Sequence, residues 1–211
     1  MSEKSPVQVY GHHNIVSCPA WTSTNELKIA VHLRAEGGSS LFFSGDFSNF
    51  NRTDDDVSIT PTNGFTADSS IFGLAKAFLS LDSMTHKKLQ KLCYYAKAWY
   101  LALCDTNLVK EDFQAWVHGA VQPGLYQRYK KYGFDLIPRI IGPIRVPEEF
   151  LSFSKEVFSS YGHLSGDELE ALNHSERPWR EARGSLRPWE KCETVISEAS
   201  MKDFYRSMIQ Q

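Results

Sequence analysis

Long apolar runs are absent from this sequence of 211 residues. No hydrophobic stretch approaches the roughly 18 to 20 residues that a helix needs to cross a bilayer, and the first residues contain no apolar core of a signal peptide. Glycine (13 residues) and proline (9 residues) are too few for a collagen-like or low-complexity chain. We therefore expect a globular cytoplasmic protein that folds around its own core without a disulfide or a metal.

Cysteine is scarce as well. The four cysteines are Cys18, Cys93, Cys104 and Cys192, and no two of them form a C-x-x-C pair. This usage is typical of free thiols in a reducing compartment. Cys93 falls among apolar residues at helical spacing, so we expect it to be a small buried hydrophobe rather than a nucleophile.

The common catalytic motifs are also missing. The sequence contains no P-loop, no G-x-G-x-x-G, no H-E-x-x-H and no G-x-S-x-G. His174 and Glu176 match the H-x-E half of a zinc deaminase signature, but the P-C-x-x-C half is absent. His12, His13 and Cys18 lack a second ligand pair at the spacing of a metal site. We therefore predict a protein that is not an enzyme and that uses no cofactor or metal.

The spacing of apolar residues has two different periods along the chain. Residues 27–33 alternate apolar and polar side chains, and after a turn residues 41–43 supply a second strand, which together predict a β-hairpin. Residues 57–59 indicate a third short strand. From about residue 67 the spacing of apolar residues becomes helical. The predicted fold class is α+β, with a small antiparallel β-rich module over residues 1–66 and a mostly helical domain over residues 67–211.

The longest predicted helix follows Thr85, a good N-cap residue. It carries an apolar stripe from Leu89 to Leu103, so we expect it to lie at the centre of the core. Its other face holds three lysines that we interpret as solvated surface: Lys87, Lys91 and Lys97.

Shorter helices are predicted around it. Their ranges are about 71–78, 123–132, 147–161 and 198–208, and a further helix begins at a capping box formed by Ser165 and Glu168. Residues 113–117 are predicted to be extended, and residues 174–179 form an aromatic-rich corner.

Charge is unevenly distributed along the chain. The net charge is −2, but residues 80–145 hold 10 basic and 5 acidic side chains, whereas residues 1–70 hold 4 and 8, and residues 146–211 hold 8 and 12. The basic segment also contains several tyrosines. Basic and aromatic side chains together can bind a protein partner or nucleic acid. The alternative is that the tyrosines pack inward and the lysines only keep the chain soluble.

Three segments of the helical part resemble the motifs of the Panacea domain, also known as the SocA-like or phage-associated GepA-like domain. They are Thr85–Ala96 continued by Trp99–Leu103; Phe113–Trp116 with Gly119, Val121, Pro123 and Tyr126; and Leu164–Leu169 with His174–Trp179, Ala182 and Arg183. The motifs occur in the family's order, and the resemblance covers about residues 70–208. Ala120 stands where the family has a proline, Gln122 precedes Pro123, and residues 1–66 lie outside the resemblance.

The resemblance implies a helical domain without a known catalytic centre, which binds and neutralises a toxin encoded beside it in bacterial and phage toxin–antitoxin pairs. We therefore expect an antitoxin that binds a cognate protein toxin, the product of a neighbouring gene. One branch of the family implies an alternative, a proteolytic adaptor that delivers its toxin to an ATP-dependent protease. A DNA-binding autoregulator is disfavoured because the predicted N-terminal module is acidic and would repel phosphate. An enzyme with a convergent site is the remaining alternative.

The candidate partner-binding residues combine the basic segment with these motifs. They are Lys87, Lys91, Tyr94, Lys97, Tyr126, Arg128, Trp179 and Arg183. We expect the large motif residues Trp99, Trp116 and Trp179 to serve mainly as core. Membranes and nucleic acids are not expected partners.

Overall fold

The structure of the protein is a computed structural model that describes residues 14–17, 30–33 and 67–208. The described residues belong to two compact units: residues 67–204 lie in one, and the first two strands and residues 205–208 lie in the other, so that the last helix of the chain begins in the first of these units. Strands β1 (Asn14–Ser17) and β2 (Ala30–Leu33) pair antiparallel, with Asn14 opposite Leu33 and Ser17 opposite Ala30.

The β-rich module over residues 1–66 stays a prediction. Strand β2 lies inside the predicted strand 27–33. The other two predicted strands, at residues 41–43 and 57–59, lie outside the described residues. The predicted domain boundary after residue 66 falls at the edge of the described segment and likewise stays a prediction.

The other unit is mostly helical, as predicted. Its helices are α1 (Ile71–Leu81), α2 (His86–Cys104), α3 (Pro123–Tyr129), α4 (Glu148–Tyr161), α5 (Gly166–Ser175), α6 (Arg177–Arg183) and α7 (Glu198–Ser207), and a 3₁₀ turn, η1 (Lys130–Tyr132), follows α3. Two small antiparallel sheets join β3 (Met84–Thr85) to β6 (Leu136–Ile137) and β4 (Gln114–Trp116) to β5 (Gly119–Val121). Within the described residues no helix combines the length and the apolar character needed to span a bilayer.

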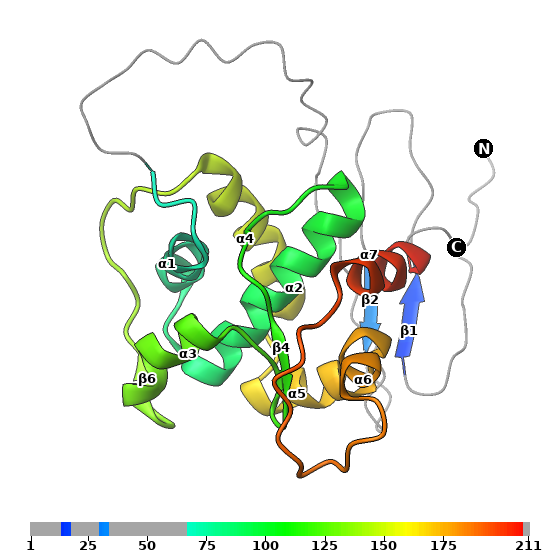
Figure 1. Cartoon of the computed structure of the whole chain (residues 1–211). Helices are drawn as coiled ribbons and strands as arrows, with labels where there is room; N and C mark the ends of the chain where they lie inside the picture. Colours follow the sequence, from blue (N-terminus) through cyan, green and yellow to red (C-terminus); the bar gives the residue numbers. More distant parts are fainter. Residues whose placement is uncertain (1–13, 18–29, 34–66, 209–211) are drawn as a thin grey trace, which may run out of the picture. The chain divides into compact units, whose positions relative to one another are not determined.

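Helix α2 lies at the centre of this unit (Figure 1) and packs against α1, α3, α4, α5 and β5. Every residue from Leu89 to Ala102 is buried, which confirms the predicted central helix. The Thr85 hydroxyl caps it by accepting from the Lys88 backbone N–H at 3.3 Å. Cys93 is fully buried, and burial raises the pKa of its thiol, so the prediction of a buried small hydrophobe is confirmed.

The other helix ends follow local rules. Ser165 and Glu168 form the predicted capping box, with the Ser165 N–H donating to Glu168 Oε2 at 2.7 Å and the Glu168 N–H donating to Ser165 Oγ at 3.2 Å. Helix α4 ends at Gly162. The aromatic corner predicted at 174–179 is the junction of α5 and α6, where Glu176 ends the first helix and Pro178 fits the first turn of the next.

The interpretation of Lys91 and Lys97 as solvated surface is wrong. Their residues are 1% and 0% exposed, respectively. The cause is that neighbouring elements cover α2 on all sides, so it has no solvated face over its central turns. Of these three lysines, only Lys87, in the first turn of α2, keeps a partly exposed side chain.

Candidate functional site

The candidate site is built around a hairpin of two short strands. The hairpin, residues Gln114–Val121, pairs Ala115 with Ala120 and Trp116 with Gly119. Helices α2 and α5 contact β5, and α6 contacts β4. The outer edge of β4 is paired as well, because the Ala115 N–H donates to the Thr194 carbonyl at 2.9 Å. Three helices and the segment around Thr194 therefore hold the hairpin in the unit.

Lys91 fixes the tip of the hairpin from α2. Its Nζ donates to the backbone carbonyl oxygens of His118 at 2.5 Å and Ala120 at 3.0 Å. Burial lowers the pKa of Lys91 to about 7, while the charge of Glu170 opposes that change. A buried amine that satisfies two hairpin carbonyls is a structural anchor, since a carbonyl left unpaired in the core is costly.

Gly119 makes the close approach of Lys91 possible. Its φ of +88° is in a region that favours glycine. A Cβ added there would lie 2.7 Å from Lys91 Nζ and 2.9 Å from Asn173 Oδ1. The missing side chain therefore provides the space into which both polar groups fit.

Asn173 continues the network into α5. The Ala120 N–H donates to Asn173 Oδ1 at 2.7 Å, and Asn173 Nδ2 donates to Glu176 Oε2 at 3.2 Å. Both side chains are buried. Burial, reinforced by the nearby charge of the Glu176 carboxylate, raises the pKa of Tyr95 well above its ordinary value. A continuous buried polar network thus runs from α2 through β5 to the junction of α5 and α6.

Two side chains from α6 hold the other strand. Trp179 Nε1 donates to the Trp116 carbonyl at 3.1 Å, and Arg183 Nη1 donates to the Ala115 carbonyl at 3.2 Å. Together with Lys91, they supply a side-chain donor to the carbonyls of residues 115, 116, 118 and 120. Side chains of α2 and α6 therefore hold the hairpin backbone in place.

The exposed side of this assembly combines aromatic and charged groups. We define the hairpin face as Lys87, Trp116, His118 and Tyr126. Lys87 Nζ lies 2.7 Å from a carboxylate oxygen of Asp167 and 2.7 Å from one of Glu170. Such half-exposed aromatic and charged side chains on a rigid support are typical of protein-recognition surfaces.

Ring contacts and a histidine–carboxylate contact organise the hairpin face further. The rings of Trp116 and Tyr126 meet edge-on with centroids 5.1 Å apart, and His86 meets Tyr126 at 5.7 Å. His118 Nδ1 lies 3.1 Å from Glu170 Oε1. Glu170 therefore joins Lys87 on α2 to His118 at the hairpin tip.

The eight predicted partner-binding residues divide by burial. Lys87 and Tyr126 are partly exposed and Arg128 is exposed, with its guanidinium 4.9 Å from the Phe72 ring centroid. The remaining five are buried: Lys91, Tyr94, Lys97, Trp179 and Arg183. Tyr94 belongs to the core, where its ring contacts Tyr95 and Phe113. Trp99 and Trp179 are buried as expected for core residues, and Trp116 is half-buried.

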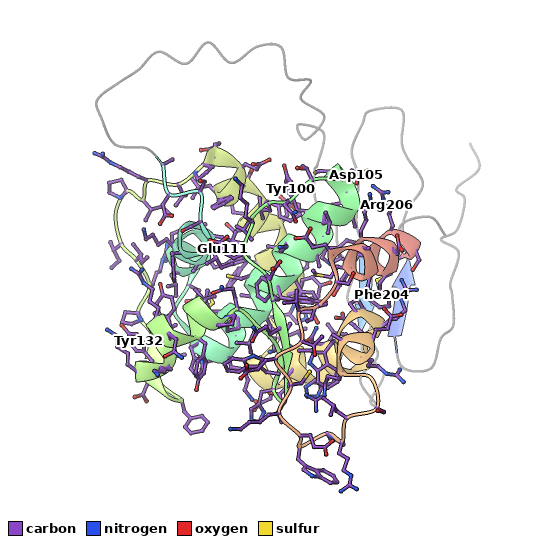
Figure 2. The ribbon with its side chains drawn as sticks, in the orientation of Figure 1. Tyr100, Asp105, Glu111, Tyr132, Phe204 and Arg206 are labelled. Carbon is purple, nitrogen blue, oxygen red and sulfur yellow. The ribbon has the colours of Figure 1, made fainter. Side chains whose placement is uncertain are left out.

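Lys97 serves a different part of the unit. Its Nζ donates to the Glu111 carbonyl at 2.9 Å and pairs with Glu198 Oε1 at 2.7 Å. Glu111, labelled beside α1 in Figure 2, also accepts from the Ile71 N–H through its side chain at 3.0 Å. Lys97 therefore joins α2 to the segment that follows it and to the first turn of α7.

The candidate metal and thiol residues have other roles where the structure describes them. The His174 ring stacks on Trp179 at 4.2 Å, while Glu176 accepts from Asn173. No group of three or more metal-ligating side chains occurs within the described residues. Burial raises the pKa of Cys104 to about 11, which disfavours its thiolate. His12, His13 and Cys18 lie outside the described residues.

Several residues of the network were not predicted from the sequence. They include Gly119, Asn173, and the pair Gln90 and Gln122, which exchange two hydrogen bonds of 3.1 and 2.9 Å between α2 and the start of α3. Asn173 could have been found, because it lies one helical turn after Leu169, and both are fully buried on the same face of α5. Gly119 belongs to the second Panacea motif, which does not predict its role beside Lys91, and nothing in the local pattern distinguishes Gln90.

The fold and the network define a small helical domain whose buried polar groups hold a hairpin. Residues 89–180 match the family model described as the antitoxin SocA-like, Panacea domain. The match runs from α2 into α6 and includes Lys91, the hairpin, Asn173 and Trp179. It confirms the resemblance predicted from the motifs. No curated protein and no solved structure matches the chain significantly.

Proposed function

We propose that the protein is an antitoxin that neutralises a cognate protein toxin by binding it directly and without catalysis. The observation that carries the proposal is the match of residues 89–180 to the SocA-like antitoxin family. The contacts of Lys91, Asn173 and Trp179 support it, since these groups bind the chain's own hairpin. A domain of this kind offers a fixed surface, and a fixed surface loses little entropy on binding.

The hairpin face is the part of this surface that we assign to the toxin. Trp116 and Tyr126 provide aromatic area, Lys87 provides charge beside it, and His118 provides an exposed polar ring. The buried residues Lys91, Trp179 and Arg183 contribute by positioning the hairpin rather than by touching the partner. An interface of roughly 1,200 to 2,000 Å² centred here is large enough for a stable complex that covers a toxin's active site.

Co-expression with the product of the neighbouring gene tests the proposal. That product alone should arrest growth, and the full chain should restore it. Trp116→Ala combined with Lys87→Glu should lose the rescue while the protein stays folded by circular dichroism. The matched control Lys155→Glu, an exposed position on α4, should keep it. A product that is harmless alone, or that stays toxic beside the soluble, folded chain, refutes the antitoxin role.

The half-life of the partner separates simple neutralisation from the adaptor alternative. Under our proposal the partner accumulates in a stable complex with this chain. An adaptor would instead shorten the partner's half-life, and removing the host's ATP-dependent proteases would restore it. That second result would replace the proposed mechanism with delivery to proteolysis.

A further inference from the structure

The loop after α6 presents a second surface, far along the chain from the hairpin tip. Trp189 is 70% exposed and Leu186 is 42% exposed. The Arg187 guanidinium lies 5.8 Å from the Trp189 ring centroid. Large apolar side chains that gather at an exposed site commonly mark an interaction surface.

This loop, residues 184–190, is held in one shape by a buried arginine. Arg183 Nη2 donates to the carbonyl oxygens of Arg187 at 2.7 Å, Pro188 at 3.3 Å and Glu190 at 2.9 Å. The Arg187 N–H donates to Glu190 Oε2 at 2.6 Å, which closes the turn. The guanidinium that orders the loop also binds the hairpin through Ala115. Trp189 therefore projects from a preorganised backbone, and little entropy would be lost when it binds.

A pocket of about 670 Å³ lies beside the loop. Its lining includes His174, Arg177, Trp179, Arg180, Glu181 and Leu186. Stacked rings and aliphatic groups make one part of the wall apolar. A pocket that combines an apolar wall with a few charged groups at its edge suits a ligand of mixed character.

The charge of the pocket favours an acidic ligand. Arg180 is exposed and has no ion-pair partner among the described residues. The one carboxylate in the wall, Glu181, is already engaged by Arg177 Nε at 3.7 Å and by the Ser200 hydroxyl. Arg180 is therefore left to attract a carboxylate of a partner, and Arg and Trp are among the residue types enriched at binding hot spots.

We propose that this pocket and Trp189 bind an extended acidic segment of a protein partner. An apolar side chain of the segment enters between Trp179 and Leu186, and carboxylates on either side meet Arg180 and Arg187. A protein segment is favoured over nucleic acid because Leu186 and Pro188 form apolar walls that suit an aliphatic side chain. The identification of the partner as a toxin rests on the proposed function, whereas the chemistry of the pocket does not.

A peptide titration of the full-length protein tests the pocket directly. The probe is a synthetic hexapeptide that alternates glutamate with leucine, and the matched control replaces each glutamate with glutamine. Indole N–H signals are followed by NMR, with Trp189→Phe identifying the Trp189 signal. The Trp189 signal should shift with the acidic peptide and saturate, and the glutamine peptide should bind about tenfold more weakly or worse.

Charge reversal at two exposed basic positions sharpens the test. Arg180→Glu should weaken binding of the acidic peptide by about tenfold or more. Lys130→Glu, an equally exposed position on the turn after α3, should leave it unchanged. The proposal is overturned by an unmoved Trp189 signal, by equal binding of both peptides, or by equal effects of the two variants. A single-stranded oligonucleotide that shifts Trp189 at the same concentrations would overturn the assignment to a protein segment.

The same surface is then examined with the partner from the co-expression test. Trp189→Ala should weaken the complex by about tenfold or more, whereas Phe134→Ala should not. Phe134 is a matched control because it is 99% exposed on a different loop. If the wild type rescues growth but neither Trp189→Ala nor the peptide has an effect, this inference alone fails. If the peptide binds but no rescue occurs, the antitoxin proposal fails and the pocket stands.

Discussion

Two buried lysines on one helix differ in how the protein balances their charges. Lys97 lies against carboxylates, with Glu198 at 2.7 Å and Asp112 at 3.9 Å. Lys91, six residues earlier, donates instead to the carbonyl oxygens of His118 and Ala120. Both side chains are enclosed, so the difference lies in their partners rather than in their exposure.

The difference separates two tasks within α2. The contacts of Lys91 lie entirely inside the residues that match the Panacea model, and they hold the hairpin. Lys97 connects this region to Glu198, which lies beyond the match. The carboxylate whose charge acts on Lys91 is Glu170, which already pairs with Lys87. We infer that the stabilisation by Lys91 depends on the space that Gly119 leaves for its amine, and that it changes with pH. The stabilisation by Lys97 depends instead on the carboxylate of Glu198.

Crowding the space around Lys91 should cause the largest loss of stability. Gly119→Ala adds a Cβ within 3 Å of two polar groups at a positive φ. Strain and overpacking together should lower the free energy of unfolding by roughly 2 to 5 kcal/mol, measured by urea denaturation. Gly133→Ala, also at positive φ but with no atom within 4 Å, should cost only the strain. Equal losses for both would show that the Lys91 site is not tightly packed.

Removing Lys97 should cause the next largest loss of stability. Lys97→Ala deprives Glu198 of its ion-pair partner and the Glu111 carbonyl of its side-chain donor, and it should cost about 2 kcal/mol, less than for a fully buried pair because Glu198 reaches solvent. A double-mutant cycle with Glu198→Gln should reveal a coupling of about 1 kcal/mol. A coupling of zero would mean that the ion pair contributes nothing.

The contribution of Lys91 to stability should depend on pH. The unfolded pKa of lysine is about 10.4, and the folded pKa of Lys91 is about 7. Between these values the unfolded chain binds more protons, so stability should rise with pH, by at most about 1.4 kcal/mol per pH unit. Lys91→Met should remove this part of the rise between pH 7 and 10. An identical pH profile for wild type and Lys91→Met would contradict the assignment.

The smallest effect is expected at the partly exposed end of the same helix. Lys87→Ala removes ion pairs to Asp167 and Glu170 that solvent screens, so it should cost less than about 1 kcal/mol. The loss should shrink further in 1 M salt. A loss as large as that of Lys97→Ala would mean that burial does not distinguish the lysines of α2.

The elements fixed by local chemistry could be predicted from the sequence. Thr85 and the capping box at Ser165 and Glu168 set the starts of α2 and α5, because a cap needs only neighbouring backbone groups. Pro123 begins α3 and Gly162 ends α4 for similarly local reasons. The Panacea motifs were recognised because their residues recur in a fixed order along the chain.

The buried polar network could not be predicted, because it depends on contacts between distant segments. Asn173 meets Ala120 across 53 residues, and Arg183 meets Ala115 across 68. The sequence does contain one sign that α2 is enclosed on all sides. From Leu89 to Ala102 every residue except Gln90, Lys91 and Lys97 is apolar or aromatic, and a helix that is apolar all round is buried. Read in that way, the two lysines would have been expected inside.

Direct mixing of purified components tests the central claim, that this domain acts by binding. The full chain and the product of the neighbouring gene are combined at micromolar concentrations, without protease or nucleotide, and analysed by size exclusion with light scattering beside an assay of the toxin's activity. The account predicts a stable complex of defined stoichiometry and a loss of toxin activity in proportion to it. The absence of a complex, or a complex whose toxin remains fully active, would contradict it.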